Sequence, residues 1–507
     1  MTDGHQDGSK ATMLSSTSVA GHSRASRAGL ASSSTQRCCS RAFTTRRVRL
    51  TPCAAAASSK QLPSEADVVV VGAGLAGLNA AAVLRKRGLA PVILEAGDGV
   101  GGRTRTDVVD GFLLDRGFQI FLTGYPEARE TLDFEALQLQ PFYAGARVWY
   151  NGQFHTVADP LRHFADGLLS LTNPVGSVVD KVNVGLFRLK TLIGPLDAIF
   201  EKPETTILER LRAEGFSEAI IDRFFRPFLG GIFFNTQLTT SSRLFEFVMR
   251  MLATGQNCLP AAGIGAMAQQ LEARLPADSI YTDVRVQQVF GAAGGSPARV
   301  QLADGSSITA SKGVVVAVEG PEAARLLGGA LDAAPSKTEA GVGTCNLYFK
   351  APQPPSPDNV LYLNGTGSGL VNNCCFPSTV APSYAPAGQA LVSVSTIGTQ
   401  PDLSEQQLID AVKQELSAWF GQQQVSTWSH LRTYRIPFAQ PNQNPPTNFS
   451  RPVALGAGLY VAGDHRDSAT FDAALRSGRR AAEALLQEQG GAGAAAGGSR
   501  AVVQASA

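Results

Sequence analysis

The chain has 507 residues, 44% of them hydrophobic, and a formal charge of +2. That length accommodates two or three domains with sizeable cores. The near-neutral charge argues against nucleic acid as a partner. The chain also has no run approaching the roughly 20 apolar residues that a membrane-spanning helix needs, so we expect at most peripheral membrane contact.

Residues 1–60 have the composition of a transit peptide and are expected to be disordered. The first 56 residues hold eight Lys or Arg and two Asp or Glu, and there is no acidic residue from Gly8 to Ser64. Organelle presequences are similarly rich in Arg and Ser and poor in acid. Abundant serine and weak amphipathic order favour the chloroplast over the mitochondrion. The alternative is an ordinary disordered tail.

The body begins with a nucleotide-binding pattern. Residues 67–71 form a β-branched strand, a GxGxxG turn follows, a helix extends to about residue 87, and a second strand at 91–94 ends on Glu95. In this setting the glycines admit a pyrophosphate to the helix N-terminus, and the acid binds ribose hydroxyls rather than a 2′-phosphate. The residues expected to contact the cofactor here are Gly72, Gly74, Leu75, Ala76, Gly77, Glu95 and Ala96.

The next segment distinguishes FAD from NAD. Gly101, Gly102 and Arg103 form a glycine-rich cationic loop suited to a diphosphate. This loop resembles that of the flavin amine oxidase superfamily, which includes amine oxidases, protoporphyrinogen oxidases and carotenoid desaturases. The turn at 115–119 also resembles the family's turn beside the flavin. The resemblance implies FAD as cofactor, with Gly117 and Phe118 near it.

Residues 120–257 are predicted to be mainly helical and to belong to a substrate domain. The segment is crowded with phenylalanine and interrupted by Arg223, Arg226 and Arg243. Two interpretations remain open, a helix core and an apolar pocket gated by these cations. The phenylalanines are Phe224, Phe225, Phe228, Phe233, Phe234, Phe245 and Phe247.

The middle of the chain returns to the nucleotide fold. Residues 279–289, 298–306 and 312–318 predict strands and a hairpin with an Asp-Gly turn. By resemblance, Val286 marks the backbone that meets adenine. Gly263 and Gly265 also fit a GxGxxA pattern, but no β-branched strand precedes them, and we interpret the segment as the start of a helix. With no second dinucleotide site, NADPH is not expected to reduce the flavin.

The segment near 340–450 favours an apolar substrate over an amine. By resemblance, Thr344 stands where many amine oxidases carry a lysine near the flavin. A tryptophan-rich aromatic cage is not evident, and residues 434–441 are more similar to the proline-containing loop of protoporphyrinogen oxidases and desaturases.

The far end of the chain completes the cofactor pattern. Residues 458–464 predict a strand that ends in Gly463-Asp464, and residues 473–482 predict a helix of small residues. The resemblance implies that Asp464 binds the ribityl or pyrophosphate part of FAD. It also implies that the helix, with Ala473 where relatives often have glycine, points its positive end toward the flavin.

The remaining reactive residues suggest neither a metal site nor a catalytic base. Cys258, Cys345, Cys374 and Cys375 lack zinc-site spacing and are expected to be reduced, buried thiols. His155, His163 and His430 are interpreted as surface or core residues, and His465 as support near the flavin. No catalytic residue is assigned, because flavin can accept a hydride without a protein base.

These patterns predict an α/β protein in which a Rossmann-like FAD-binding domain of discontinuous segments encloses an α+β substrate domain. The FAD-binding domain comprises 61–119, 258–335 and 452–488, the substrate domain comprises 120–257 and 336–451, and 489–507 is a low-complexity tail. The expected activity is FAD-dependent dehydrogenation or isomerisation of a small apolar plastid metabolite, such as an isoprenoid, polyene or tetrapyrrole. Oxygen or a quinone is the expected electron acceptor. The alternatives are an FAD-dependent amine oxidase and a flavin-containing binding protein with little turnover.

Overall fold

Strands from distant parts of the chain form the first sheet. The computed structural model describes residues 61–159, 162–331 and 341–497. The strand order is β10-β2-β1-β13-β12-β11, and β20 also pairs with β13 and with β19. These strands are β1 (Glu65–Val71), β2 (Pro91–Leu94), β10 (Ile280–Tyr281), β11 (Val286–Phe290), β12 (Ala298–Leu302), β13 (Ser307–Val316), β19 (Ala454–Gly456) and β20 (Leu459–Val461).

The central strands β2, β1, β13 and β20 are parallel. Strand β13 is long enough to serve two neighbours along one edge. Its first half pairs antiparallel with β12 around the Asp304-Gly305 turn, and its second half pairs parallel with β20. The carboxyl ends of β1 and β13 therefore lie side by side, at the edge where parallel α/β sheets bind ligands.

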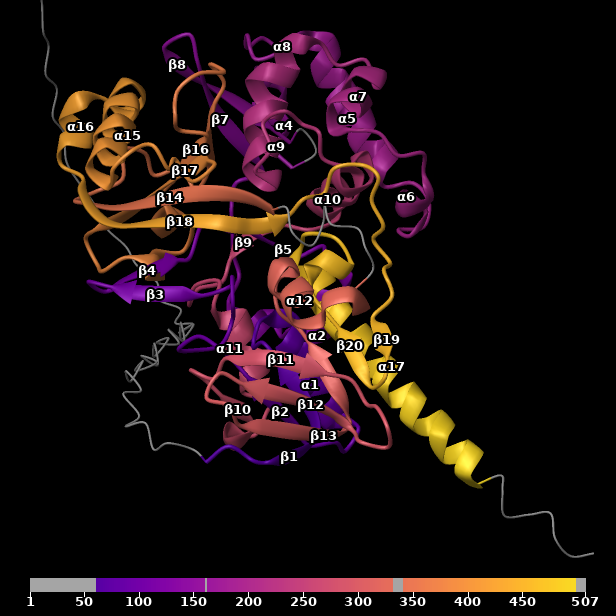
Figure 1. The fold of residues 1–507 in the computed structure, drawn as a ribbon. Coiled ribbons are helices and arrows are strands. Elements are labelled where there is room, and N and C mark those ends of the chain that lie inside the picture. Colours follow the sequence, from indigo (N-terminus) through magenta and orange to yellow (C-terminus); the bar gives the residue numbers. More distant parts are fainter. Residues whose placement is uncertain (1–60, 160–161, 332–340, 498–507) are drawn as a thin grey trace, which may run out of the picture. The chain divides into compact units, whose positions relative to one another are not determined.

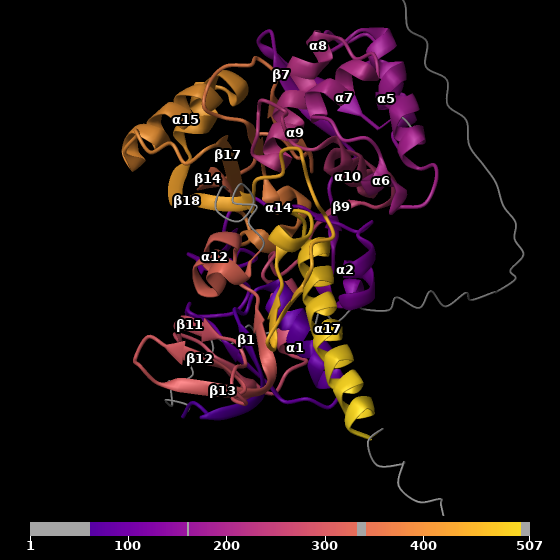
Figure 2. The ribbon, with the colours of Figure 1, turned by 45° about the vertical axis from the view of Figure 1, so that its right-hand side comes forward.

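Strand β1 is covered on both faces, as its run of valines predicts. Val68 and Val70 pack into a core with helices α1 (Leu75–Lys86), α11 (Ala266–Glu272) and α17 (Phe471–Gly497). Val69 and Val71 pack into a second core with β11, β12 and α12 (Gly320–Leu327). Helix α17, yellow, lies alongside the indigo α1 in both views, which brings the two ends of the described chain together (Figures 1 and 2).

A second sheet lies apart from the first (Figure 1) and has the order β18-β14-β17-β16-β15-β7-β8. Helix α15 (Glu405–Phe420) buries its apolar side chains against one face, and α16 (Gln422–Ser426) follows it. The strands are β7 (Gly145–Tyr150), β8 (Gln153–Ala158), β14 (Gly341–Ala351), β15 (Leu361–Asn364), β16 (Asn373–Cys375), β17 (Ala390–Ile397) and β18 (Ser429–Pro441).

A group of helices between β8 and β9 adjoins this sheet. Its members are α4 (Phe164–Ser170), α5 (Val178–Thr191), α6 (Ala198–Glu201), α7 (Ile207–Ala213), α8 (Glu218–Ile220), a π-helical turn (Ile221–Phe225), α9 (Arg226–Phe233) and α10 (Ser242–Thr254). Across the described part of the chain, no helix is both long and apolar enough to span a bilayer.

Short elements connect the two sheets. The hairpin of β3 (Thr106–Val109) and β4 (Phe112–Asp115) follows the glycine-rich loop. A small sheet has the order β5-β9-β6, and helices α2, α3 and α14 lie in the connections. Their bounds are β5 (Phe121–Leu122), β6 (Gln140–Pro141), β9 (Asn257–Leu259), α2 (Pro126–Thr131), α3 (Phe134–Leu137) and α14 (Pro377–Val380).

The predicted fold class is confirmed, and one local expectation needs correction. Residues 145–158, expected within a mainly helical segment, form the hairpin of β7 and β8, because they alternate inward and outward side chains on the second sheet. Helix α17 extends to Gly497, into the segment predicted to be a low-complexity tail. The predicted transit peptide and the last ten residues lie outside the described residues.

The four cysteines of the body are free and buried, as expected. Burial raises the pKa of the Cys345 thiol to about 11, so the thiol stays protonated at neutral pH. Within the described ranges, no cluster of three or more His, Cys, Asp or Glu side chains could hold a metal ion.

Candidate functional site

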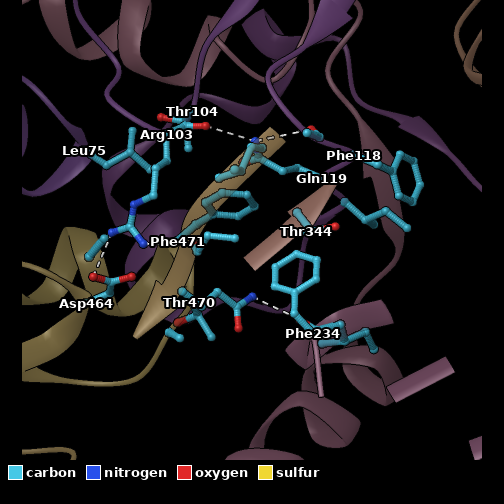
Figure 3. A pocket seen from close by; sticks show the side chains of 18 of the residues that line it. Leu75, Arg103, Thr104, Phe118, Gln119, Phe234, Thr344, Asp464, Thr470 and Phe471 are labelled. Carbon is cyan, nitrogen blue, oxygen red and sulfur yellow. Dashed lines mark hydrogen bonds and ion pairs between the residues drawn. The ribbon is translucent and has the colours of Figure 1, made fainter. Parts of the chain in front are cut away.

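A cavity of about 470 Å³ extends from the first sheet to the second. One end lies at the carboxyl ends of β1 and β13, and the other lies against α9, α10 and the second sheet. Figure 3 shows Leu75, Arg103 and Asp464 on one side of this pocket and Phe118, Phe234 and Thr344 on the other. The predicted cofactor residues that line it are Gly72, Gly74, Leu75, Ala76, Glu95, Gly101, Gly102, Arg103, Gly117, Phe118, Gly463 and Asp464.

The turn after β1 is shaped by close backbone contacts. Gly72 has φ +102°, and a Cβ there would lie 2.7 Å from the Ala317 carbonyl oxygen. Gly77 brings α1 onto the turn, since a Cβ there would lie 2.0 Å from the Gly72 oxygen. At Gly74, by contrast, an added Cβ would meet nothing within 4 Å, and no side chain caps α1. The first amide N–H groups of α1 therefore remain available to an anion at the cavity.

Glu95 and the glycine-rich loop form the adjoining wall. The Glu95 carboxylate accepts hydrogen bonds from the backbone N–H groups of Ala73 and Gly97, each at 2.8 Å. These bonds fix the carboxylate at the end of β2, where lone pairs remain for ribose hydroxyls. Gly102 has φ +57°, and a Cβ there would be 3.5 Å from the Gly74 Cα, so the loop approaches the turn closely.

Arg103 connects the two ends of the described chain. Its Nη2 lies 2.8 Å from Asp464 Oδ1, and its Nη1 donates to the Ala439 carbonyl at 3.0 Å (Figure 3). Burial lowers the pKa of Arg103, but Asp464 and Glu319 outweigh burial and hold it above its usual range. A permanent cation thus lies beside the open end of α1, where a diphosphate needs one.

Glu319 is an acidic residue in the same wall that the sequence patterns did not indicate. It lies three residues beyond the end of β13 and lines the cavity, and it interacts electrostatically with Arg103. Burial raises the pKa of Glu319 above its usual range, and Arg103 opposes that shift only in part. The segment of Ala317, Val318 and Glu319 could have been found from the parallel-sheet rule, because it extends the strand beside β1.

Ala473, the predicted cofactor contact near the start of α17, does not line the cavity. Ala473 is 1% exposed, and its N–H donates to Thr470 Oγ1 at 3.1 Å. Ala474 lines the cavity instead, together with Thr470 and Phe471. A Ser or Thr just before a helix is a capping signal, so Thr470 could have been noticed in the sequence.

Three other predicted residues lie outside the cavity lining. Gly77 packs under the turn, and Ala96 is exposed. Val286, the first residue of β11, is 3% exposed and belongs to the core of the first sheet. The Val286 carbonyl accepts a hydrogen bond from Arg325 at 3.2 Å. Contact of these residues with a cofactor stays a prediction.

His465 is buried beside Asp464 and does not line the cavity. It is 2% exposed, and neither ring nitrogen has a hydrogen-bond partner among the described residues. Burial lowers the pKa of His465 to about 4, so the imidazole is neutral at physiological pH. Its ring packs against Gly463, which is consistent with a supporting role.

The far end of the cavity is apolar. Its lining comes from α9, α10, the β5–β9 sheet and the second sheet, and includes Leu122, Phe228, Ile232, Phe233, Phe234, Val248, Leu252, Leu361, Leu363 and Ile436. Phe225, Phe245 and Phe247 belong to the helix core. The phenylalanine-rich segment therefore supplies both a core and a cavity wall.

Of the two open interpretations of this segment, the one with a gate of cations is wrong. Arg223 lies over the Tyr150 ring and donates to the Pro174 carbonyl. Arg226 pairs with Asp222, and Arg243 donates to the Lys202 carbonyl. These arginines bind backbone and surface acids around the helices, and none of them lines the cavity.

Thr344 lines the cavity from β14. By resemblance, many amine oxidases carry a lysine at this position. The Thr344 Oγ1 donates a 2.8 Å hydrogen bond to the Thr396 carbonyl. The hydroxyl proton is therefore engaged within the sheet, and Thr344 offers the cavity a short, neutral side chain.

The loop at Gly263 leads into a helix, as predicted. The Ile264 N–H donates to Asp115 Oδ1 at 2.9 Å, and the Gly265 N–H donates to Thr106 Oγ1 at 2.9 Å. Burial raises the pKa of Asp115 to about 6, against the hydrogen bonds that its carboxylate accepts from Thr106 Oγ1, the Ile264 N–H and the Tyr384 hydroxyl. The amides that a second pyrophosphate would need are thus bound to side chains.

The cavity matches the flavin nucleotide that the sequence patterns indicate. The open space at Gly74, the uncapped N-terminus of α1 and the cation of Arg103 fit a diphosphate. The carboxylate of Glu95 fits a ribose. Both ends of the chain contribute, through Arg103 and Asp464. The fit rests on donor groups and space that the fold presents at one edge of the first sheet.

Comparison with known proteins identifies the family. The model of the flavin containing amine oxidoreductase family matches residues 75–486, most of the chain. The chain belongs to this family. Its cofactor is therefore FAD, and its class of reaction is oxidoreduction.

Individual proteins resemble the chain to different extents. Hydroxysqualene dehydroxylase of Rhodopseudomonas palustris is 27% identical over 450 residues, which cover 83% of this chain and 98% of that protein. An oxidoreductase from Methanosarcina mazei shares the fold, with a TM-score of 0.64 at 18% identity and coverage of 83% and 99% of the two chains.

Other matches are short. Protoporphyrinogen oxidase 2, chloroplastic/mitochondrial, of Arabidopsis thaliana is 28% identical over 173 residues, 32% of each chain. A flavin-containing amine oxidase of Oncorhynchus mykiss is 60% identical over 40 residues, 8% of each chain. The chain thus matches a third or less of the length of these two curated relatives.

Proposed function

We propose that this protein dehydrogenates or isomerises an apolar metabolite, such as an isoprenoid, a polyene or a tetrapyrrole, with electrons passing to oxygen or a quinone. The observation that carries the proposal is the continuous cavity that joins a nucleotide cradle to an apolar chamber. FAD, when bound, accepts a hydride from a substrate carbon and returns the electrons to the acceptor. The protein residues bind and orient the substrate and exclude water from it.

In this proposal the cradle residues hold the cofactor. The N–H groups of Leu75 and Ala76 and the guanidinium of Arg103 bind the diphosphate, and Glu95 binds the adenosine ribose. Asp464 orients Arg103 toward the diphosphate through their 2.8 Å ion pair, and its carboxylate would accept hydrogen bonds from ribityl hydroxyls. Gly117 and Phe118 also line the cavity, and in this proposal they would form the wall next to the reacting end of the cofactor.

The apolar chamber supplies position rather than acid–base chemistry. The charged residues in the cavity lining are Glu95, Arg103, Arg116, Glu319 and Asp464, and the lining from α9, α10 and the second sheet is uncharged. Aromatic and aliphatic side chains favour an apolar substrate by the hydrophobic effect and keep water from the reaction. Hydride transfer to FAD needs no protein base, so the lack of an ionisable pair there suits the proposal.

An amine oxidase is the second candidate. The family model carries that name, and putrescine oxidase of Kocuria rosea is 56% identical to the chain over 55 residues, 11% of this chain. Thr344 and the uncharged chamber oppose it, because an amine substrate arrives as an ammonium that an apolar site binds poorly.

Anaerobic reduction of the FAD-loaded protein separates the candidates. We expect fractionated plastid lipids and pigments to bleach the flavin and to yield a product two hydrogens lighter, detected by mass spectrometry. An isomerisation would leave the flavin without net bleaching and give a product of unchanged mass, separated by chromatography. Bleaching by putrescine or cyclohexylamine, with no response to the lipid fractions, would select the amine oxidase. A flavin inert to both sets, with no new product, would indicate a binding protein with little turnover.

A plastid location is part of the proposal and rests on the acid-free, Arg- and Ser-rich composition of residues 8–60. The similarity to a chloroplastic/mitochondrial protein supports an organelle in general terms. A fluorescent reporter fused after residue 60 is expected to enter chloroplasts. A cytosolic reporter would contradict the location and remove the reason for ranking plastid metabolites first.

Peripheral membrane contact is also proposed, through helix α5. Its inward face consists of Asp180, Val184, Phe187 and Thr191. Its outward face and the residues that follow carry seven of the eight large hydrophobic side chains that are exposed in the described part of the chain: Val178, Val179, Val182, Leu186, Leu189, Leu192 and Ile193. An apolar stripe of this kind inserts at the headgroup boundary of a bilayer. A membrane would also store an apolar substrate.

A further inference from the structure

We propose that the side-chain amide of Asn373 is a hydrogen-bond donor site for one neutral oxygen function, a hydroxyl or a carbonyl, on an otherwise apolar substrate. The inference rests on the proposed function and narrows its substrate class. It assigns to the apolar chamber a residue that distinguishes an oxygenated ligand from a hydrocarbon.

The second sheet places Asn373 on the chamber side. Cys374, its neighbour on β16, packs into the core beneath α15, so Asn373 points to the opposite face. Asn373 is paired with Ser395 on β17, Ser395 with Asn346 on β14, and Asn346 with Tyr434 on β18. These four residues form one polar row across the sheet, and Asn373 is the member of the row that lines the cavity.

The bonds of Asn373 leave its donor free. Its Oδ1 accepts from the Nδ2 of Asn372 at 2.9 Å, and Asn372 also donates to the Pro227 carbonyl at 3.0 Å. Asn373 is only 4% exposed. Within the described residues its Nδ2 has no hydrogen-bond partner. The amide faces the cavity, where an acceptor on a ligand would add one net hydrogen bond, about 0.5–1.5 kcal/mol.

Helix α9 holds this amide pair in place. A Cβ at Gly231 would lie 2.9 Å from Asn372 Nδ2 and 3.1 Å from Asn373 Oδ1. The glycine therefore lets the helix backbone press against both amides. Because Oδ1 is fixed toward Asn372, the Nδ2 of Asn373 has one remaining direction, and the donor is pre-organised before a ligand arrives.

The surroundings of Asn373 define the chemistry of its ligand. Leu363 lies opposite Asn373 in the β15–β16 pair, and Leu361 and Phe228 line the same chamber. An amide donor beside these apolar side chains favours a ligand that carries an acceptor over a hydrocarbon. The chamber lining contributes no charge that could pair a carboxylate or an ammonium. A buried charged group would stay unpaired and is disfavoured.

Binding of a matched set of probes to the full-length, FAD-loaded protein tests the inference. The probes share one fifteen-carbon isoprenoid skeleton: farnesene, farnesal, farnesoic acid and farnesylamine. We expect equilibrium dialysis to show farnesal binding about two- to tenfold more tightly than farnesene, the range of one net hydrogen bond. The acid and the amine are expected to bind more weakly than farnesal.

Two variants locate the effect. Asn373→Leu is expected to abolish the preference for farnesal while farnesene binds as before. Asn373→Asp exchanges the donor for an acceptor and is expected to reverse the preference; it carries the test alone if Asn373→Leu does not fold. The matched control is Asn448→Leu, at an exposed asparagine outside the cavity lining, which should retain the wild-type preference.

The outcomes distinguish failure of the donor site from failure of the proposed function. If farnesal and farnesene bind equally to the wild type, or if both Asn373 variants keep the preference for farnesal, the donor site is wrong although an apolar substrate remains. If no probe binds saturably, or if only farnesylamine does, the proposed function itself fails.

Discussion

At the scale of single residues, the contact between Arg103 and Asp464 joins segments from opposite ends of the chain. The ion pair is 2.8 Å long, and the side chain of Asp464 is 7% exposed while that of Arg103 is 35% exposed. Neither residue would hold a diphosphate or ribityl group in the right place without the other.

Removing either partner is therefore expected to weaken FAD binding. Arg103→Ala and Asp464→Ala each lose a charge-assisted hydrogen bond, which costs roughly 1.5–3 kcal/mol, or about ten- to a hundredfold in the dissociation constant. Flavin fluorescence during reconstitution of the apoprotein measures the change. Arg85→Ala, at an exposed arginine near the end of α1, is the matched control. Wild-type affinity in both cavity variants would refute the split site.

Glu319 is expected to oppose the cofactor that its neighbours bind. The Glu319 carboxylate lines the cavity in the expected diphosphate region, as Asp464 does, and Arg103 is the opposing cation. Burial raises the pKa of Glu319. Glu319→Gln removes one like charge and should tighten FAD binding on the order of threefold. Glu319→Asp keeps the charge and should resemble the wild type.

The pH dependence of FAD binding checks the role of Glu319. Because the folded-state pKa is raised, the carboxyl group is neutral below that pKa and repels a diphosphate only above it. Wild-type affinity should therefore rise as pH falls through the Glu319 pKa, and the dependence should flatten in Glu319→Gln. Parallel pH profiles for the two proteins would assign the dependence to other groups.

At the scale of elements, the packing of α17 on α1 determines the position of the nucleotide cradle. A Cβ at Gly478 would lie 2.1 Å from the Ala76 carbonyl oxygen, and both contacting groups are helix backbone. The two helices are therefore as close as their main chains allow, and α1 carries the amides of Leu75 and Ala76 to the cavity.

Gly478→Ala is expected to push the two helices apart. Overpacking of this kind costs typically about 1–3 kcal/mol of unfolding free energy, and displacement of α1 should also weaken FAD binding. Urea unfolding and FAD titration measure both. Gly185→Ala in α5, where a Cβ meets nothing within 4 Å, should be neutral or stabilising by up to about 1 kcal/mol. Equal stability of the two variants would show that the helices can separate without cost.

Helix α5 provides the second prediction at this scale. Leu186→Glu combined with Leu189→Glu places charge in the exposed apolar stripe, where these leucines are 51% and 50% exposed. We expect co-sedimentation with galactolipid vesicles to fall about tenfold or more. Val108→Glu, at an exposed valine of β3 (67%), is the matched control. A dimer that the double change dissociates, without any vesicle binding, would assign the stripe to a second copy of the chain.

At the scale of the whole molecule, one dinucleotide cradle serves the described fold. The strand, glycine turn and helix unit at Gly72 is complete. At Gly263, a Cβ would lie 2.4 Å from the Thr106 side chain, and the neighbouring amides are bound to Asp115 and Thr106. A nicotinamide donor needs its own pyrophosphate and ribose contacts.

NADPH is accordingly not expected to reduce the bound flavin. In anaerobic stopped flow, the flavin absorption should persist with excess NADPH and disappear with dithionite, which serves as the positive control. Rapid stoichiometric bleaching by NADPH without a partner reductase would place the protein among reductases, and it would show that a second nucleotide site exists.

The sequence alone indicated the features that depend on local order. The run of valines at 68–71, the glycines that follow and Glu95 define a strand, turn and strand whose geometry requires those residue types, so the nucleotide fold could be named beforehand. The family resemblance added Gly117, Phe118 and Asp464 to the expected cavity residues. The tertiary structure decided what depends on register and packing. Glu319, Thr470 and Asn373 meet at the cavity because strands and helices far apart in sequence align there. Arg223, Arg226 and Arg243 do not gate the cavity, because they bind carbonyls and acids around the helices. The outward face of α5 became visible only when its inner face was packed, since a stripe of apolar residues on a helix does not tell which side the core will cover.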